Sequence, residues 1–502
     1  MEYFDVVLFS PPSRMINHYR PPVGLMYVGG YLTHKGFKVK IIDVPLKEQI
    51  RDKKFVENIG TVVENVHQEM IALFKMLKTR IVGISCYTPE YYEVLRLARE
   101  IKAIDKNVIV VVGGVHATFY PQDLFDGQTD IDICILGDGE LSMEAILHSL
   151  KNDNKRSFDN IQGIAFRDRE SGKIQINLQK TFQQDLDSIS YPDYNLIDMD
   201  YYANANPYAI RGCFLRTMYL LSTRGCPSQC TFCVAKKLRQ YMGSGRKRSA
   251  TSLIKEIIDL KKRYAIDAFY FIDDLFTIDK ENVKQFCFLL KAEKMSLVWG
   301  CSSKVSTLDE DILKIMANAG CVQIDFGVER GSDEALRSVK KGINISMIKH
   351  IFSLCHKYHI RTFANMLVNL PNETERDLDD ILRLLDDISS EIVSLNIFTP
   401  YPGTEIYDKS PFSFKKDEYP HLSQSMIELL KDNPERFRYA AHKVDLGKWV
   451  SANSKKYNHL LPNLRFYFDR RFWNAILHSR AKFNYLSQSS LLIKEFINQK
   501  FG

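Results

Sequence analysis

Six short apolar runs recur at intervals of about 30 residues between Met218 and Phe398, each followed or preceded by an amphipathic helical pattern. Strands that alternate with helices in this way predict a parallel sheet. Six such units suit a curved partial barrel, in which functional residues gather at the carboxyl ends of the strands. The strands are expected at Met218–Ser222, Ala268–Ile272, Leu297–Ser302, Val322–Val328, Thr362–Val368 and Val393–Phe398.

A second set of apolar runs precedes this barrel. Strands are expected at Tyr3–Ser10, Lys38–Asp43, Arg80–Ser85, Val108–Gly113 and Ile131–Leu136, with helices over 21–32, Glu57–Leu77, Tyr91–Ile104 and Leu141–Leu150. This alternation predicts a doubly wound, Rossmann-like parallel sheet, so the fold class is α/β. The expected domains are residues 1–181 for that sheet, 182–212 for a linker, 213–407 for the barrel and 408–502 for a mainly helical C-terminal region.

Three cysteines, Cys226, Cys230 and Cys233, lie within eight residues directly after the first barrel strand. Thiolates select iron-sulfur clusters or zinc, and three of them can hold three irons of a cubane cluster while the fourth iron stays open. Gly225 allows the loop to turn sharply after the strand. A zinc site that lacks one ligand and a set of buried thiols are the alternatives.

Carboxylates stand where two barrel strands are expected to end. Asp273 and Asp274 follow the second strand, and Glu329 follows the fourth. Paired carboxylates at this rim can accept hydrogen bonds from an ammonium group, and Glu329 can accept from both hydroxyls of a ribose. For the aspartate pair, helix capping or a salt bridge is the alternative.

Small and polar residues follow the strands of the N-terminal sheet, where a doubly wound fold binds its ligands. Paired glycines allow a ligand to approach the backbone closely, although ordinary turn chemistry would also select them. The candidate binding residues are Ser85, Gly113, Gly114, His116, Gly137 and Glu140.

The composition favours a cytoplasmic protein. No apolar run reaches the ~20 residues of a membrane span, and Met1–Pro12 is too short and too acidic for a secretory signal. Apart from the three clustered residues, the 10 cysteines are scattered, which fits reduced thiols better than a disulfide framework.

The formal charge of +7 comes from the last 52 residues, which carry nine Lys or Arg against Asp469 and Glu495. Ten aromatic residues are interleaved with these cations, including Phe472 and Trp473. The first interpretation is a helical cap that packs on the barrel. Contact with a membrane surface, which would make the protein peripheral to a membrane, is the second. No RNA-binding motif accompanies the charge, so a nucleic-acid partner is not expected.

The spacing C-x3-C-x2-C from Cys226 to Cys233, with Phe232 before the last cysteine, resembles the signature of the radical S-adenosylmethionine (SAM) superfamily. Further segments resemble landmarks of its barrel: Phe271–Phe276, Gly327–Glu329, Lys341–Gly342, Leu370–Thr374 and Thr399–Thr404. The resemblance implies a 4Fe-4S cluster on the three cysteines, with Phe232 beside it. Asp273 or Asp274 would hold the SAM amino group, and Glu329 would hold the ribose.

The same resemblance implies that an external electron donor such as flavodoxin or ferredoxin reduces the cluster, so that cleaved SAM yields a 5′-deoxyadenosyl radical. Two residues depart from the family pattern. Arg330 stands where a small residue is common, and Asn372 stands where glycine is usual.

Residues 1–181 resemble the cobalamin-binding domain that precedes the radical SAM barrel in the methylase and cyclase branch of that superfamily. The resemblance rests on Pro11–Pro12, Pro21–Leu25, Gly113–Thr118 and Gly137–Glu140. The D-x-H-x-x-G motif that supplies a cobalt-ligating histidine is absent after the first strand. The resemblance therefore implies cobalamin bound without a protein histidine, with His18 or His116 as a lesser alternative ligand.

Together these resemblances imply a cobalamin-dependent radical SAM C-methyltransferase that acts on a small-molecule or lipid substrate. The alternatives are a radical SAM cyclase, a radical SAM enzyme without bound cobalamin, and a non-catalytic metal- or cobalamin-binding sensor.

Overall fold

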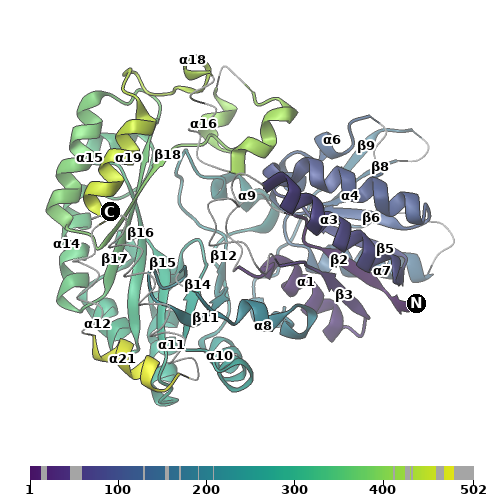
Figure 1. Ribbon diagram of the computed structural model, residues 1–502, viewed down its shortest axis with the longest axis horizontal. Coiled ribbons are helices and arrows are strands. Elements are labelled where there is room, and N and C mark those ends of the chain that lie inside the picture. Colours follow the sequence, from purple (N-terminus) through teal and green to yellow (C-terminus); the bar gives the residue numbers. More distant parts are fainter. Residues whose placement is uncertain are drawn as a thin grey trace. The chain divides into compact units, whose positions relative to one another are not determined.

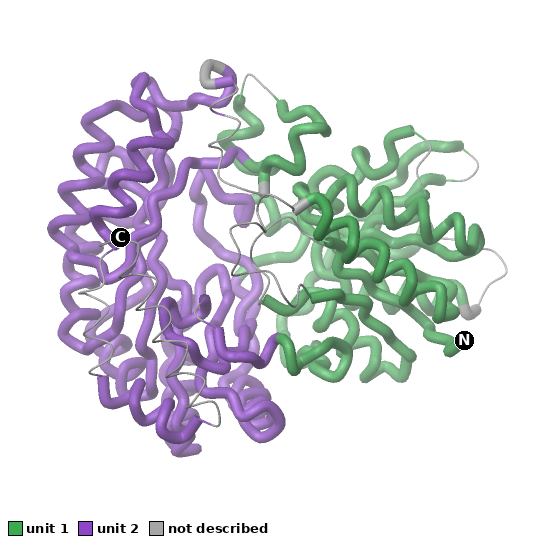
Figure 2. The backbone as a smooth tube through the Cα atoms, in the orientation of Figure 1, with its two compact units in different colours: residues 1–201, 237–244, 401–424 green, residues 202–236, 245–400, 425–502 purple. Residues whose placement is uncertain are grey.

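The computed structural model describes residues 1–12, 20–45, 59–127, 130–152, 158–168, 171–189, 191–206, 208–410, 413–423, 430, 433–458 and 469–479. The chain divides into two compact units, which Figure 2 shows in green and purple. Unit 1 comprises residues 1–201, 237–244 and 401–424, and unit 2 comprises residues 202–236, 245–400 and 425–502. Two segments that follow barrel elements in the sequence are therefore part of unit 1.

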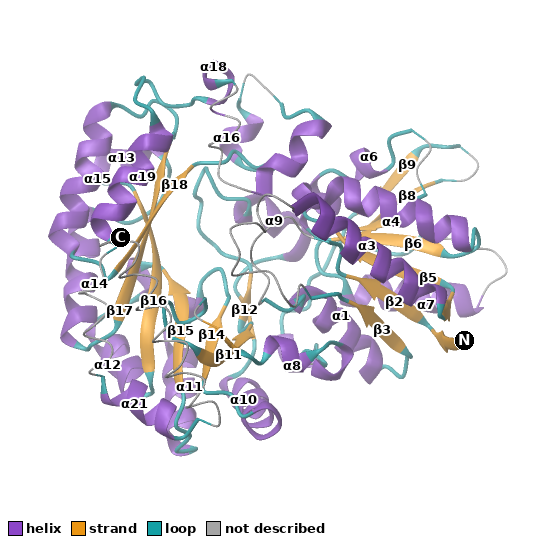
Figure 3. Cartoon of the chain, viewed as in Figure 1, coloured by secondary structure: helices purple, strands orange, loops and turns teal. Residues whose placement is uncertain are grey.

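Unit 1 is built on a seven-stranded sheet in the order β3-β2-β5-β6-β7-β8-β9 (Figure 3). Its strands are β2 (Val6–Phe9), β3 (Val39–Ile42), β5 (Ile81–Ser85), β6 (Ile109–Gly113), β7 (Ile133–Ile135), β8 (Ile164–Arg167) and β9 (Ile174–Asn177). The first five strands in this order are parallel. The strand order reverses between β2 and β5, which is where a doubly wound sheet binds its ligand.

The predicted doubly wound sheet is confirmed, and two differences have clear causes. The run Tyr3–Ser10 forms two strands, because Asp5 accepts a 2.7 Å hydrogen bond from the amide of Lys38 and interrupts it. Its first part, β1 (Glu2–Phe4), pairs instead with β4 (Leu77–Thr79). At the other edge, β8 and β9 add an antiparallel hairpin.

The helices of unit 1 follow the predicted alternation. They are α1 (Val23–His34), α3 (Ile59–Lys75), α4 (Tyr91–Ile104), α5 (Val115–Phe119), α6 (Pro121–Leu124) and α7 (Glu140–Asn152), with a 3-10 turn η1 (Thr88–Glu90). Unit 1 also contains most of α9 (Ala235–Met242), together with α16 (Glu405–Asp408) and η6 (Lys416–Ser423). The division between the two units falls within the residues of helix α8 (Met199–Tyr202) in the sequence.

Unit 2 contains the predicted curved sheet of six parallel strands. They are β11 (Leu215–Leu220), β14 (Ala268–Phe271), β15 (Val298–Ser303), β16 (Cys321–Glu329), β17 (Arg361–Val368) and β18 (Ile392–Ile397) (Figure 1). A two-residue strand, β10 (Ala205–Asn206), pairs antiparallel with β11 at the edge. Each strand lies within a few residues of its predicted position.

Helices cover the outer face of this sheet. They are α10 (Ala250–Tyr264), α11 (Lys280–Ala292), α12 (Glu310–Asn318), α13 (Asp333–Ser338), α14 (Ile345–Lys357) and α15 (Glu375–Ile388). Phe269 and Phe271 of β14 contact Phe286 of α11, and Phe326 of β16 contacts Phe352 of α14. Because side chains alternate along a strand, residues next to these point to the inner face of the sheet.

The described parts of the C-terminal region pack on the barrel. Its helices are α18 (Pro434–Phe437), α19 (Leu446–Tyr457) and α21 (Arg470–Leu477). Phe472 of α21 is fully buried in a cluster with Leu215, Ala268 and Val298, which lie at the amino ends of three strands. Arg471 donates hydrogen bonds of 2.9 and 3.1 Å to the carbonyls of Cys321 and Ala317. Helix α21 is therefore a cap under the barrel.

The aromatic residues Phe466, Tyr467 and Phe468, which belong to the same expected cap, lie outside the described residues. Among the residues that the structure describes, no helix is both long and apolar enough to cross a membrane.

Candidate functional site

The three cysteines lie on the loop that follows β11. Their loop is held by a short antiparallel pair, β12 (Thr223–Arg224) with β13 (Arg246–Lys247), and Gly225 turns away from it at φ +81°. The amide of Thr231 donates a 3.1 Å hydrogen bond to the carbonyl of Val339, which fixes the middle of the loop. The loop conformation is thus determined by neighbouring backbone.

All three residues are free thiols, and Cys230 is buried while Cys226 and Cys233 are partly exposed. Burial raises the pKa of Cys233 to about 11, and the nearby carboxylate of Asp274 and the other two thiols add to this shift. Burial also raises the pKa of Cys230, which the ammonium groups of Lys341 and Lys304 act to lower. The cysteine loop therefore has two carboxylates, Asp274 and Glu329, and two cations, Lys304 and Lys341, around it.

Within the described ranges, no three His, Cys, Asp or Glu side chains are arranged as donors to a single metal ion. A single zinc ion needs its sulfur ligands gathered at about 2.3 Å from one centre. A cubane cluster takes one thiolate per iron and therefore accommodates more widely spaced sulfurs. The donor set of three thiols on one loop fits a cluster better than a mononuclear zinc site.

The two aspartates after β14 have different surroundings. Asp273 is buried and accepts hydrogen bonds from the amides of Ser222 and Thr223 at 2.6 and 2.9 Å, and also from the Ser222 hydroxyl. Asp274 is exposed and makes no hydrogen bond or ion pair with any described residue. Asp273 thus holds the start of the cysteine loop, whereas Asp274 is available to a ligand.

Glu329 ends β16 at a β-bulge, where the register against β17 shifts between Gly327 and Glu329. Its carboxylate accepts a 2.9 Å hydrogen bond from Lys341, and both side chains are nearly buried. A Cβ atom at Gly327 would lie 2.4 Å from Oε1 of Glu329 and 2.6 Å from Nζ of Lys341. A side chain at position 327 would therefore push the Glu329–Lys341 pair out of its present position.

Two lysines near the cysteines were not among the residues expected from the sequence. The ammonium of Lys341 lies 5.5 Å from the centre of the Phe232 ring. Lys304 follows β15 and donates a 3.3 Å hydrogen bond to the hydroxyl of Ser228 in the cysteine loop. The position of Lys304 at a strand end was the only sequence signal for it, and Lys341 lay in a noted motif without an assigned role.

The two departures from the family pattern also have structural explanations. Arg330 is buried and forms an ion pair with Glu373. Asn372 has φ +62°, a left-handed conformation that asparagine tolerates better than most residues other than glycine.

In unit 1, the expected binding residues gather at the carboxyl ends of β5, β6 and β7. Ser85 ends β5, Gly113 ends β6, and Glu140 begins α7. Gly114 has φ +102°, and a Cβ there would meet the carbonyl of Cys86 at 2.7 Å. A Cβ at Gly137 would meet the carbonyl of Tyr241 at 2.4 Å. Close packing of the chain on itself therefore accounts for both of these glycines.

His116 is fully enclosed. Its Nδ1 lies 3.2 Å from the hydroxyl of Thr88, while its buried Nε2 has no hydrogen-bond partner among the described residues. The rings of Tyr91, Tyr120 and Tyr419 surround the imidazole. Burial lowers the pKa of His116 to about 4, with the nearby Lys416 adding to the shift. His18, the other histidine considered, lies outside the described residues.

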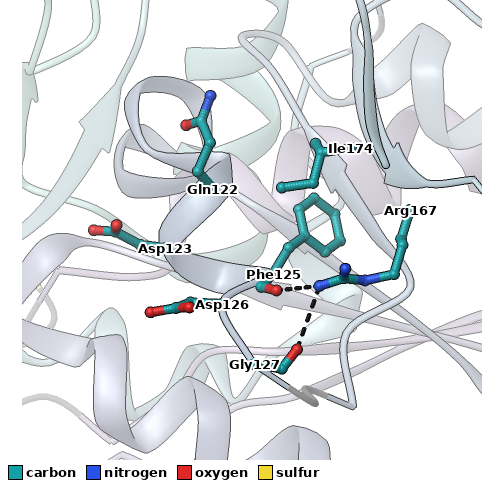
Figure 4. Close-up of a pocket in the computed structure, with 7 residues that line it drawn as sticks. All are labelled: Gln122, Asp123, Phe125, Asp126, Gly127, Arg167 and Ile174. Atoms are coloured by element: carbon teal, nitrogen blue, oxygen red, sulfur yellow. Dashed lines mark hydrogen bonds between the residues drawn. The ribbon is translucent and has the colours of Figure 1, made fainter. Parts of the chain in front are cut away.

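A pocket of about 500 Å³ lies elsewhere in unit 1 (Figure 4). Its lining comprises Gln122, Asp123, Phe125, Asp126, Gly127, Arg167 and Ile174. Arg167 donates hydrogen bonds to the carbonyls of Phe125 and Gly127. None of the residues expected from the sequence lines this pocket.

Comparisons with known proteins give two family matches. Residues 220–385 match the radical SAM superfamily, and residues 15–147 match the B12 binding domain. The first match contains the three cysteines, Asp274 and Glu329, and the second contains His116 and the glycine turns.

Two relatives extend over most of the chain. An uncharacterised methyltransferase of Pyrococcus horikoshii is 27% identical over 81% of this chain and 83% of its own length. The anaerobic magnesium-protoporphyrin IX monomethyl ester cyclase of Rubrivivax gelatinosus is 26% identical over 78% of this chain and 66% of its own length. The fold is shared with the radical SAM methyltransferase TsrM from Kitasatospora setae, solved with cobalamin and a [4Fe-4S] cluster. The TM-score is 0.62 and the sequences are 18% identical, with 82% of this chain and 78% of that chain covered.

Proposed function

Because the chain joins a B12 binding domain to a radical SAM domain, we propose that it is a cobalamin-dependent radical SAM enzyme that methylates a carbon atom. One observation carries the proposal most strongly. Three features lie at the carboxyl ends of strands in unit 2. They are the loop with three free thiols after β11, the unpaired carboxylate of Asp274 after β14, and Glu329, paired with Lys341, at the end of β16. Barrel enzymes place their reactive groups at this end.

Cys226, Cys230 and Cys233 would hold a 4Fe-4S cluster, and Lys341 and Lys304 would offset its negative charge. Bound at the open iron, SAM would supply a 5′-deoxyadenosyl radical. Asp274 would accept hydrogen bonds from the SAM ammonium, and Lys304 has the charge and position to bind its carboxylate. Glu329 would accept from the ribose hydroxyls, and Phe232 would pack beside the cluster.

Unit 1 would hold cobalamin at the carboxyl ends of its strands. Ser85, Gly113, Gly114, Gly137 and Glu140 would border the ligand. His116 would support this site from behind, because its Nε2 is buried and lies 3.9 Å from the carboxylate of Asp123. The imidazole is enclosed by three tyrosines, which supports cobalamin binding without a cobalt–histidine bond.

The inner face of the barrel favours a polar small molecule over a lipid as substrate. Ser302, Asp325 and Asn365 alternate with outward-facing core residues on three strands, and each is partly exposed. Each of them makes a hydrogen bond within the barrel, and an acyl chain would bury the polar atoms that these bonds leave over, which costs free energy. A soluble reductant such as flavodoxin or ferredoxin would supply the electron. The buried face of α21, which includes Phe472, packs on the barrel and does not support membrane contact by the described tail.

A second candidate is a radical SAM cyclase, because a cyclase is among the relatives that cover most of the chain. The mass of the product separates the two. Methylation adds one CH₂ to the substrate, whereas oxidative cyclisation adds no carbon from SAM. Products from cells that lack the protein, compared by mass with those of the parent, would reveal the substrate and this difference.

Anaerobic reconstitution tests the proposal directly. The full chain should bind about four irons and form 5′-deoxyadenosine from SAM and a reductant. Cys230→Ala should lose the cluster and SAM cleavage, whereas Cys287→Ala, at a buried thiol on α11, should keep both. A colourless protein that carries zinc, or a cluster-free protein that binds cobalamin without turnover, would favour the sensor. Cleavage without a cob(II)alamin spectrum would favour an enzyme that lacks cobalamin.

A further inference from the structure

Glu329 has an unusual backbone conformation. Its φ is +71°, and the amide of the next residue, Arg330, donates a 2.9 Å hydrogen bond to the carbonyl of the preceding residue, Val328. These features define a γ-turn with positive φ, a rare and strained conformation. A non-glycine residue keeps such a conformation only where its surroundings over-determine it.

Part of that constraint comes from Arg330. Its buried guanidinium is ion-paired with Glu373, lies 3.3 Å from Asp377 and donates a 3.2 Å hydrogen bond to the carbonyl of Leu367. Arg330 is therefore fixed by partners other than those of the adjacent Glu329, whose carboxylate is paired with Lys341. Movement of the Arg330 side chain would release the strained residue next to it.

The partner carboxylate is itself held from the C-terminal region. Oε1 of Glu373 accepts hydrogen bonds from the amide of Asn369 at 2.9 Å and from Nε2 of His442 at 3.1 Å. The amide of Val444 lies 3.2 Å from Nδ1 of His442 and donates to it. This bond leaves the proton of the neutral imidazole on Nε2, directed at Glu373.

The segment around His442 is joined to the turn after β17 by backbone as well. The side chain of Asn369 donates to the carbonyl of Phe437 at 3.0 Å and accepts from the amide of Tyr439 at 2.9 Å. The amide of Ala441 donates a 2.7 Å hydrogen bond to the carbonyl of Glu373. Residues 437–444 lie beyond the matched radical SAM region, which ends at residue 385.

We propose that His442 is a positioning residue for SAM binding, and that it acts through Glu373 and Arg330 to keep Glu329 in its strained turn. The inference rests on the proposed function, because Glu329 is taken to hold the SAM ribose. His442 itself contacts neither SAM nor the cluster. The C-terminal region would thus complete the cofactor site of the barrel.

The test compares two substitutions of His442. His442→Leu removes the hydrogen bond to Glu373 and replaces histidine by a side chain of similar size. His442→Gln keeps a side-chain N–H donor. His350→Leu, at an exposed histidine on the outer helix α14, is the matched control. The measurements are equilibrium dialysis of SAM against the reconstituted full-length protein, iron content, thermal stability, and the rate of 5′-deoxyadenosine formation.

His442→Leu should raise the Kd for SAM about tenfold, which corresponds to about 1.4 kcal/mol. The rate at saturating SAM should change less than about twofold, because the lost interaction is made equally in the ground and transition states. His442→Gln should restore most of the affinity. If His442→Leu does not fold, Arg330→Lys, which keeps the charge but loses the planar fork, should give the same rise in Kd.

Unchanged SAM affinity in His442→Leu would overturn the inference. If His442→Leu does not fold, unchanged SAM affinity in Arg330→Lys would overturn it instead. An equal loss of SAM affinity in His442→Leu and His442→Gln would also overturn the inference. Failure of the proposed function would look different, because the unsubstituted protein itself would then bind no cluster or cleave no SAM.

Discussion

The backbone amide of Ser222 donates a 2.6 Å hydrogen bond to the buried carboxylate of Asp273. This bond joins the end of β14 to the first residues of the loop that carries the three cysteines. Asp273 also accepts from the Thr223 amide and the Ser222 hydroxyl, so its oxygens are occupied by the protein. The neighbouring Asp274 is left as the carboxylate that can meet a ligand.

Asp274→Asn should therefore weaken SAM binding without loss of the cluster. Removal of the negative charge takes away the partner of the SAM ammonium, and we expect the Kd to rise about tenfold or more, as for a charge-assisted hydrogen bond worth ~1.5–3 kcal/mol. Equilibrium dialysis against the reconstituted protein gives the Kd. Asp311→Asn, at an exposed aspartate on α12, should leave it unchanged. Wild-type affinity in the Asp274 variant would contradict this assignment.

Asp273 should make stability depend on pH. Burial raises the pKa of Asp273 to about 7, well above the ordinary value of an aspartate. The folded protein therefore holds a proton that the unfolded chain has released, and stability falls as the pH rises through this window, by about 1.4 kcal/mol per unit. The melting temperature of the wild type should thus drop between pH 5 and 7 relative to that of Asp273→Asn. If the melting temperatures of the two proteins change with pH in parallel, Asp273 does not cause the pH dependence.

Gly327→Ala should disturb the SAM site more than the fold. The new methyl group would overlap Glu329 and Lys341, both of which end in flexible side chains that can move apart. We expect a loss of SAM cleavage of about tenfold or more, with a change in stability of about 1–3 kcal/mol. Gly300→Ala gives a contrasting variant, since a methyl group there would press on the Tyr270 ring at 3.0 Å, away from Glu329 and Lys341. Equal losses of SAM cleavage in the two variants would argue against the specific role of Gly327.

The sequence predicted the sheets well because their strands are short, apolar and buried on at least one face. Helix α4 has its predicted bounds, Tyr91–Ile104, since its apolar residues recur with the helical period. The β8–β9 hairpin was not predicted because each of its strands has only four residues, and β9, which lies at the edge of the sheet, is largely not buried. Nothing in their local pattern identifies the strand with which they pair.

Tertiary contacts account for what sequence reasoning missed at the site. Asp273 and Asp274 are adjacent and identical in type, and only the fold reveals that one of them is occupied by Ser222. The sequence around Lys304 does not distinguish it from other lysines, and only the structure shows its hydrogen bond to Ser228 of the cysteine loop. His442 lies 69 residues from its partner Glu373, so no local pattern could connect the two.

His116 should not ligate cobalt. Its ring is enclosed by three tyrosines, and its low pKa keeps it neutral with Nδ1 beside Thr88. His116→Gln should therefore leave the EPR spectrum of bound cob(II)alamin unchanged in its nitrogen hyperfine splitting. Cobalamin content should fall only as far as the packing of unit 1 is disturbed. Loss of a nitrogen splitting on substitution would show that the histidine is a ligand after all.

The cap formed by α21 predicts effects of very different size for two adjacent aromatic residues. Phe472 is 0% exposed among the first residues of β11, β14 and β15, whereas its neighbour Trp473 is 39% exposed. Phe472→Ala should lower the free energy of unfolding by about 3–5 kcal/mol, because it leaves a cavity under the barrel. Trp473→Ala should change it by about 1 kcal/mol or less, since surface substitutions rarely do more. Denaturant titration of both full-length variants measures the difference, and similar losses would mean that this helix does not close the barrel as the structure has it.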